Sequence, residues 1–289
     1  MSFSLQTPVD QFEMPHPSGT GTFKISVARV AQVPGDAKVP VLYVLDGDIG
    51  FALAAEIARM RGLMGMQPTA MVVGIGYGAD FLEFAKLRTA DLTPPLSEAG
   101  RSALGNMTSF IGEQDGGAEA FLDFLTETLA PEIGRRYPEA SADERLLFGH
   151  SLGGLFAVYA LLTRPGAFSA FIANSPSLWW DGFAILDRLP AFAEKLAALA
   201  SPPRVLIGVG GQEQDVPTKV PPGLQMSLAE VQATVAASRM VDAVPELAAA
   251  LADAGLRDVE YVIYDKEDHG SVVPAAMMRG LRFAVPDRT

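Results

Sequence analysis

The sequence predicts an α/β fold, in which a mostly parallel β-sheet carries helices on both of its faces. Extended apolar segments alternate with helical patterns along the chain, as expected of successive β–α–β units. Several extended segments are apolar throughout, which is typical of parallel strands that are buried on both faces. Apolar residues make up 49% of the 289 residues and charged residues only 19%, so the chain can bury a large core.

The predicted strands are short apolar runs bounded by Gly, Pro or polar residues. They are residues 22–30, 39–45, 70–75, 145–148, 169–173, 204–209 and 259–264. We expect the sheet to be parallel except at its first one or two strands, which can be antiparallel additions.

Helical periodicity and capping signals lie between these strands. The predicted helices cover residues 51–61, 119–137 with a kink at Pro131, 152–163, a segment opening at Ser227, the segment between Pro245 and Gly255, and a last one opening at Ser271. Ser227 and Glu230 have the spacing of a capping box, and Pro245 and Gly255 follow the usual order of Pro at the start and Gly past the end.

We expect an N-terminal extension over residues 1–21 and one domain over residues 22–289. Two stretches, 79–117 and 210–224, match neither strands nor helices and are predicted to be long loops. Both follow the carboxyl ends of strands, where open α/β sheets bind ligands. The first has few apolar anchors, so we expect it to be mobile and to determine substrate choice.

Charge and composition exclude several classes of protein. The chain has 22 Lys and Arg against 34 Asp and Glu, a net charge of −12 that disfavours a nucleic-acid partner. It contains no cysteine, which excludes disulfides and a thiol nucleophile. The first residues lack the pattern of a signal peptide, and no apolar run is long enough to cross a membrane. We therefore expect a cytoplasmic protein without a membrane partner.

The motif with the clearest chemical meaning surrounds Ser151. Its sequence, Gly149-His150-Ser151-Leu152-Gly153-Gly154, follows a predicted strand and precedes a predicted helix. A very tight strand-to-helix turn requires small residues on either side of its apex and exposes the apex side chain. The pattern favours Ser151 as a nucleophile over the alternative, a serine that only caps the helix.

A serine nucleophile needs a base, and the chain has three histidines. His150 adjoins Ser151, and we expect its side chain to point away from the serine and to serve packing. His16 lies between two prolines and is predicted to be exposed. His269 lies in a polar loop after the last strand, in the order serine, acid, histidine that is common in such folds, so it is the predicted base.

A carboxylate would hold the base in the correct tautomer. The loop after the sixth predicted strand offers Glu213 and Asp215, and both qualify. Asp265 and Asp268 are weaker alternatives, because they lie too close to His269 along the chain to reach its ring easily.

The developing oxyanion needs two backbone N–H donors. The predicted donors are Leu152, directly after the nucleophile, and Gly47, in the loop after the second strand.

A glycine-rich motif at residues 74–79 resembles a dinucleotide site, but a loop with Pro94 and Pro95 follows where such a site needs a helix and a second strand. No histidine and carboxylate cluster is apparent. We expect no cofactor and no metal.

The chain resembles the esterase D-like branch of the α/β-hydrolases, in particular the siderophore (enterobactin-type) esterase group. The matching stretches keep the order of the family and are VLYVLDGD at 41–48, RTADLTP at 88–94, GGAEAF at 116–121, FGHSLGGLFA at 148–157, SPSLWW at 175–180 and HGSVVP at 269–274. The resemblance implies Ser151 as nucleophile and His269 as base, and favours Glu213 over Asp215, although some members use a Ser–His pair alone. Candidate substrate-binding residues in these stretches are Asp48, Arg88 and Trp179.

The predicted function is that of a serine carboxylic-ester hydrolase that acts through an acyl-enzyme, on a small-molecule ester that the resemblance implies is a siderophore trilactone. The alternatives are a thioesterase or acyltransferase of the same fold, which would share the acyl-enzyme, and a catalytically silent binding protein. Arg88 could supply countercharge to an anionic substrate, but we favour a structural pairing with Asp91. The sequence leaves the oligomeric state open, a homodimer included.

Overall fold

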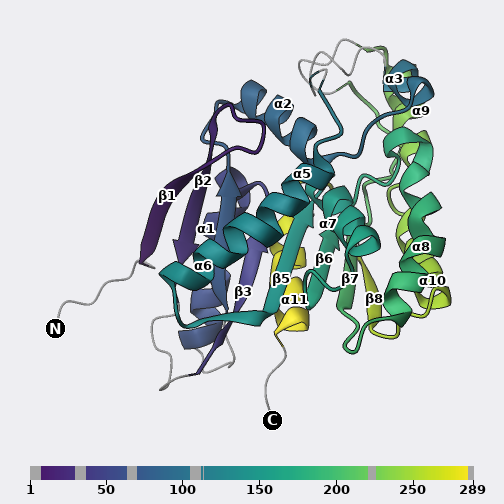
Figure 1. Cartoon of the computed structure of the whole chain (residues 1–289). Helices are drawn as coiled ribbons and strands as arrows, with labels where there is room; N and C mark the ends of the chain where they lie inside the picture. The colour runs from purple at the N-terminus through teal and green to yellow at the C-terminus, as the bar shows by residue number, and fades with distance from the viewer. Residues whose placement is uncertain are drawn as a thin grey trace.

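The computed structural model of the chain describes residues 8–29, 37–63, 70–104, 112, 114–220 and 226–285, and within these ranges the strands form one eight-stranded sheet (Figure 1). The order is β1-β2-β4-β3-β5-β6-β7-β8. β1 pairs antiparallel with β2, β2 pairs antiparallel with β4, and every later pair is parallel. The strands are β1 Val9–Pro15, β2 Thr22–Ala28, β3 Val39–Val44, β4 Met71–Gly76, β5 Ala140–His150, β6 Ala170–Asn174, β7 Arg204–Gly210 and β8 Val259–Tyr264.

β1 lies within residues 1–21, which were predicted to be an N-terminal extension, so the sequence does not predict this strand. It is an edge strand with mostly exposed side chains, so it lacks the apolar run that marks the central strands. Of its seven residues only Met14 is buried. The expected antiparallel pairing at the start of the sheet is present, and it includes this additional strand.

Helices cover both faces of the sheet (Figure 1). α1 and α11 pack on one face, and α6, α7 and α10 pack on the other, so that each layer closes its own apolar core. The helices are α1 Gly47–Leu63, α2 Phe81–Leu92, α3 Glu98–Leu104, α5 Ala118–Asp123, η2 Phe124–Leu129, α6 Ala130–Arg136, α7 Leu152–Thr163, η3 Trp180–Arg188, α8 Leu189–Ala197, α9 Leu228–Ser238, α10 Ala243–Asp253 and α11 Val272–Ala284.

The predicted helix 119–137 is present, but it widens before Pro131. Residues 124–129 form a π-helical turn, in which Ala130 donates its N–H to the carbonyl of Leu125. Proline has no N–H and its ring crowds the carbonyl one turn earlier, so a wider turn lets the helix continue through it.

The stretch 79–117, predicted to be a loop, contains two helices, and this prediction is wrong for its described part. Asp80 caps α2 by accepting hydrogen bonds from the N–H groups of Leu82 and Glu83. The hydroxyl of buried Thr89 donates to the carbonyl four residues earlier, which satisfies a polar group that would otherwise disfavour a buried helix. α2 packs against α5 and α7, so it is anchored to the core. Residues 105–111 and 113 lie outside the described part.

The second predicted loop is described over residues 210–220. It begins as the last residue of β7 and continues as turns without a helix, as expected, while residues 221–224 lie outside the described part. Among the described residues, no helix combines the length and the apolar character needed to span a bilayer.

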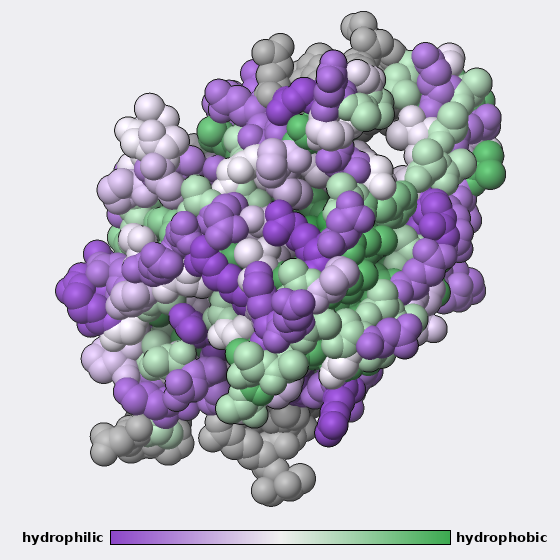
Figure 2. Space-filling view, turned by 45° about the vertical axis from the view of Figure 1, so that its right-hand side comes forward, coloured by the Kyte–Doolittle hydropathy of each residue, from purple (hydrophilic) through white to green (hydrophobic). Residues whose placement is uncertain are grey.

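Figure 2 shows polar side chains spread over one face of the molecule, with apolar residues visible between them. The parallel strands all end at one edge of the sheet. The residues singled out for chemistry follow the ends of β3, β5, β7 and β8 at that edge.

Candidate active site

Ser151 occupies a strained turn between β5 and α7. Its backbone has φ 61° and ψ −119°, a region that residues with a side chain rarely adopt. A Cβ atom at Gly149 would lie 1.9 Å from the carbonyl oxygen of Gly153, so only glycine fits before the apex. The Ser151 side chain makes no capping hydrogen bond to the helix, which argues against the alternative that it is a simple cap.

The turn is also fixed by its neighbour on the sheet. Ser151 donates its N–H to the carbonyl of Asn174 at 3.0 Å, and Ser177 donates its N–H to the carbonyl of Ser151 at 3.2 Å. Leu152 is the first residue of α7, so its N–H belongs to the helix N-terminal groups that have no partner within the helix. This N–H is therefore free to face a bound anion.

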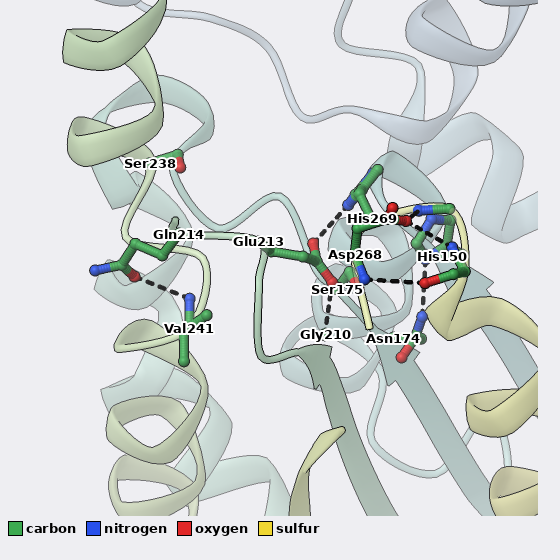
Figure 3. A network of polar contacts seen from close by, with 12 residues as sticks. His150, Asn174, Ser175, Gly210, Glu213, Gln214, Ser238, Val241, Asp268 and His269 are labelled. Atoms are coloured by element: carbon green, nitrogen blue, oxygen red, sulfur yellow. Dashed lines mark hydrogen bonds and ion pairs between the residues drawn. The ribbon is translucent and has the colours of Figure 1, made fainter. Parts of the chain in front are cut away.

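His269 and Glu213 form a close pair at the ends of β8 and β7 (Figure 3). His269 Nδ1 lies 2.6 Å from Glu213 Oε2. The other carboxylate oxygen accepts hydrogen bonds from the Ser175 hydroxyl at 2.5 Å and from the Gly210 N–H at 2.7 Å. The carboxylate side chain is 1% exposed and the imidazole 49% exposed. Asp215 is exposed and takes no part in the pair.

The charge state of Glu213 determines the tautomer of His269. Burial of the carboxyl group opposes its ionisation, but the hydrogen bond and charge of His269, together with Ser175 and Gly210, hold the pKa of Glu213 below its ordinary value. An ionised carboxylate can only accept a hydrogen bond, so Nδ1 of His269 is the donor. In the neutral imidazole Nε2 is then unprotonated and can act as a base.

His150 has a packing contact, as the sequence suggests, but its partner is the predicted base. Its ring lies against the ring of His269, with 4.5 Å between centroids and 40° between planes. Its Nδ1 atom lies 2.8 Å from the side-chain nitrogen of Asn174 (Figure 3). A strand position alone indicates only which face a side chain leaves from, so the approach of the β8 loop could not be predicted from the motif.

Arg88 is paired with Asp46, and the prediction that it pairs with Asp91 is wrong. Its Nε and Nη2 atoms donate to the two carboxylate oxygens of Asp46 at 2.8 and 2.7 Å. Nη2 also donates to the carbonyl of His150 at 3.4 Å. Asp91 instead pairs with His16, at 2.9 Å, so His16 is not the exposed residue that the sequence suggests.

The Arg88–Asp46 pair links the two turns that carry the predicted oxyanion donors. Asp46 precedes Gly47, and His150 precedes Ser151. Burial alone would lower the pKa of Arg88, but the charge and hydrogen bonds of Asp46 raise it, so the guanidinium stays charged. A Cβ atom at Gly47 would lie 2.7 Å from the backbone nitrogen of Ile75, which explains the glycine at this turn.

The other two substrate-binding candidates differ in what they contact. Asp48 accepts hydrogen bonds from the N–H groups of Tyr77 and Gly78, at 2.6 and 2.9 Å, and so fastens the start of α1 to the end of β4. Trp179 is half-buried beside Trp180, which is buried and donates its indole N–H to the carbonyl of Pro94 at 3.0 Å. A groove of about 570 Å³ lies next to Gly47 and Asp48.

The described residues contain no group of three His, Asp or Glu side chains arranged to hold a metal ion. In the same part of the chain no hydrogen bond joins the Ser151 hydroxyl to His269, although both flank His150. The arrangement offers a serine, a base oriented by a carboxylate, and N–H donors at one edge of the sheet.

Comparison with known proteins identifies the family. The model of the family described as "Putative esterase" matches residues 24–244. The siderophore triacetylfusarinine C esterase of Aspergillus fumigatus is 34% identical over 257 residues, covering 88% of this chain and 84% of that protein. The ferri-bacillibactin esterase BesA of Bacillus subtilis is 33% identical over 274 residues, covering 92% of this chain and 86% of that protein. The structure of siderophore hydrolase EstA from Aspergillus nidulans superposes with a TM-score of 0.81 at 29% identity, covering 98% of this chain and 97% of that protein. The chain therefore belongs to this esterase family and is an ester hydrolase with the α/β-hydrolase fold.

Proposed function

We propose that this enzyme hydrolyses siderophore esters through an acyl-enzyme on Ser151, with His269 as the base and Glu213 as the carboxylate that orients it. The observation that carries the proposal is the Glu213–His269 pair, 2.6 Å between Oε2 and Nδ1, which follows β7 and β8 at the same edge of the sheet as the Ser151 turn. A serine, an oriented imidazole and a buried carboxylate are the groups that acyl transfer requires.

In the first half of the reaction the Ser151 oxygen attacks the ester carbonyl carbon while Nε2 of His269 takes the hydroxyl proton. The serine and the histidine are not hydrogen-bonded without substrate, and such contacts often tighten only when substrate binds. The intermediate collapses as the imidazolium returns its proton to the leaving alkoxide. Water then repeats the sequence on the acyl-enzyme and releases the acid.

The tetrahedral intermediates carry negative charge on the former carbonyl oxygen. We assign the backbone N–H groups of Leu152 and Gly47 as its donors. Arg88 supports this assignment, because its guanidinium holds the Gly47 turn, through Asp46, beside the Ser151 turn. Its charge lies between the two turns, where it also favours the developing anion.

The names of these relatives specify siderophores as substrates, and each relative aligns with most of this chain. These names favour ester hydrolysis over thioester hydrolysis, acyl transfer to another acceptor, or a silent binding role. The cytoplasmic location and the lack of a nucleic-acid partner stay predictions from the sequence, and the oligomeric state stays open.

Product analysis by mass spectrometry tests the proposal. The purified protein is incubated with cyclic and linear siderophore esters, with and without iron, and with p-nitrophenyl esters of increasing acyl length. We expect hydrolysis of a siderophore ester, and a loss of kcat of about 10⁵–10⁶ in Ser151→Ala. A fluorophosphonate should label the native protein once and Ser151→Ala not at all. Full activity in Ser151→Ala would contradict the serine mechanism, and hydrolysis of simple esters alone would contradict the substrate class.

A further inference from the structure

The imidazole of His269 is held along one edge by Glu213, but one hydrogen bond does not fix a ring. Rotation about the line from Nδ1 to Oε2 would keep the 2.6 Å contact and swing Nε2 away from Ser151. His269 lies in a turn with no regular structure, and its side chain is 49% exposed, so packing in the core does not restrain it. A second contact is needed to direct Nε2.

His150 provides a second contact with that ring. The two ring centroids are 4.5 Å apart and the planes are tilted by 40°, so the rings are close neighbours. A ring at this distance limits the rotation that the Glu213 hydrogen bond permits. Together the two neighbours restrain His269 at two different parts of its ring.

His150 can serve as a support because it is itself held. Its Nδ1 atom lies 2.8 Å from the side-chain nitrogen of Asn174, a residue that is 0% exposed. The two residues are direct partners in the parallel pairing of β5 and β6, so the sheet determines their separation. The ring of His150 is thus fixed to the sheet, and its contact with His269 links that half-exposed side chain to the sheet.

We propose that His150 is a positioning residue whose ring directs Nε2 of His269 toward Ser151. The inference rests on the proposed function, since it assigns a role relative to the base. On this proposal the aromatic ring of His150 matters more for the activity of the enzyme than its contact with Asn174.

The charge of His150 suits this role. Burial, and then the neighbouring His269, lower the pKa of His150 to about 3. Glu213 lies on the other side and acts in the opposite direction, and Arg88 acts in the same direction as His269. His150 therefore stays neutral when His269 becomes an imidazolium during the reaction, and it places no like charge beside that cation.

Two substitutions separate the ring from the hydrogen bond. His150→Phe keeps an aromatic face and loses the contact with Asn174, whereas His150→Asn keeps an amide near the Nδ1 position and loses the face. The readouts are the rate and the endpoint of fluorophosphonate labelling, with kcat and KM for a p-nitrophenyl ester. The endpoint counts correctly folded sites, so partial misfolding does not alter the rate comparison.

We expect His150→Phe to label within about threefold of the native rate, and His150→Asn to label about 10–100-fold more slowly with a similar loss in kcat and little change in KM. In a Glu213→Gln background the further cost of His150→Asn should differ from its cost in the native protein, because both residues restrain one ring. Equal rates for the Phe and Asn variants, or strictly multiplicative costs, would overturn the proposal. Failure of the native protein to label would instead overturn the proposed function.

Discussion

Nδ1 of His269 lies 2.6 Å from Oε2 of Glu213, and the half-exposed imidazole meets a carboxylate that is almost fully buried. The second oxygen of Glu213 is occupied by Ser175 and Gly210, so the carboxylate cannot turn away. This fixed orientation is what distinguishes Glu213 from Asp215, which is exposed two residues later on the same loop.

Substitution of Glu213 should therefore lower activity much more than substitution of Asp215. Glu213→Gln should lower kcat by about 10²–10⁴, because the amide no longer selects the tautomer with an unprotonated Nε2. The matched control Asp215→Asn should stay within about twofold of the native kcat. The kcat of both variants is measured by steady-state kinetics on a p-nitrophenyl ester. Native activity in Glu213→Gln would show that the site works with a Ser–His pair alone.

Arg88 should behave as part of the framework of the site and not as a countercharge for the substrate. Its pair with Asp46 is buried, so Arg88→Met leaves an unpaired carboxylate that costs about 3–5 kcal/mol of unfolding free energy. We expect kcat to fall by a similar factor for neutral and anionic esters, because both react at the same turns. Urea unfolding and kinetics on both ester classes provide the test.

Arg135, which forms an exposed pair with Glu132 on α6, is the control for Arg88. Arg135→Gln should leave both unfolding and kinetics unchanged. A loss in Arg88→Met that affects KM for anionic esters alone would show that the arginine contacts substrate.

On the acid side of the pH profile, kcat/KM should fall because a single group becomes protonated. Glu213 has a lowered pKa and His150 a pKa of about 3, so at mildly acidic pH the carboxylate is ionised and the His150 ring is neutral. kcat/KM should therefore fall with falling pH along a slope of one. A slope approaching two would mean that a second group, such as His150, titrates with the base.

Stability should also decline on acidification, through His150. A histidine in an unfolded chain titrates near pH 6.5, whereas the folded His150 has a pKa of about 3, so the unfolded state binds the proton more readily. The contribution of the neutral ring is complete above about pH 6.5 and is lost progressively as the pH falls toward 3. Tm measured against pH should fall more steeply in the native protein than in His150→Asn over that window. Parallel curves would contradict the assignment.

The turn at Ser151 should tolerate no side chain at Gly149. The added Cβ of Gly149→Ala would lie 1.9 Å from a backbone oxygen, so the turn must open, with a loss of several kcal/mol in stability and a loss of labelling at Ser151. Gly134, in α6, offers a matched control, because an added Cβ there meets nothing within 4 Å. Gly134→Ala should stabilise the protein by about 0.5–1 kcal/mol. Thermal unfolding and fluorophosphonate labelling of both variants test this contrast.

Local patterns were enough to predict the central strands, the turn at Ser151 and the family. A strand buried on both faces must be apolar throughout, and a tight turn must be built from glycine, so both leave a signal within a few residues. The structure of the two long stretches, residues 79–117 and 210–224, was harder to predict. α2 was not predicted because its buried polar groups, such as Thr89, are satisfied by contacts that the sequence does not display.

The relations between distant loops were decided only by the tertiary structure. Arg88 and Asp46 are 42 residues apart, and Arg88 has Asp91 as a nearer candidate along the chain, so sequence distance favours the wrong partner. The choice between Glu213 and Asp215 depended on which carboxylate the end of β7 buries. The contact of His150 with His269 exists because β5 and β8 end at the same edge and the β8 loop folds back over it. Sequence determines which groups can react, whereas the register and twist of the sheet determine which of them meet.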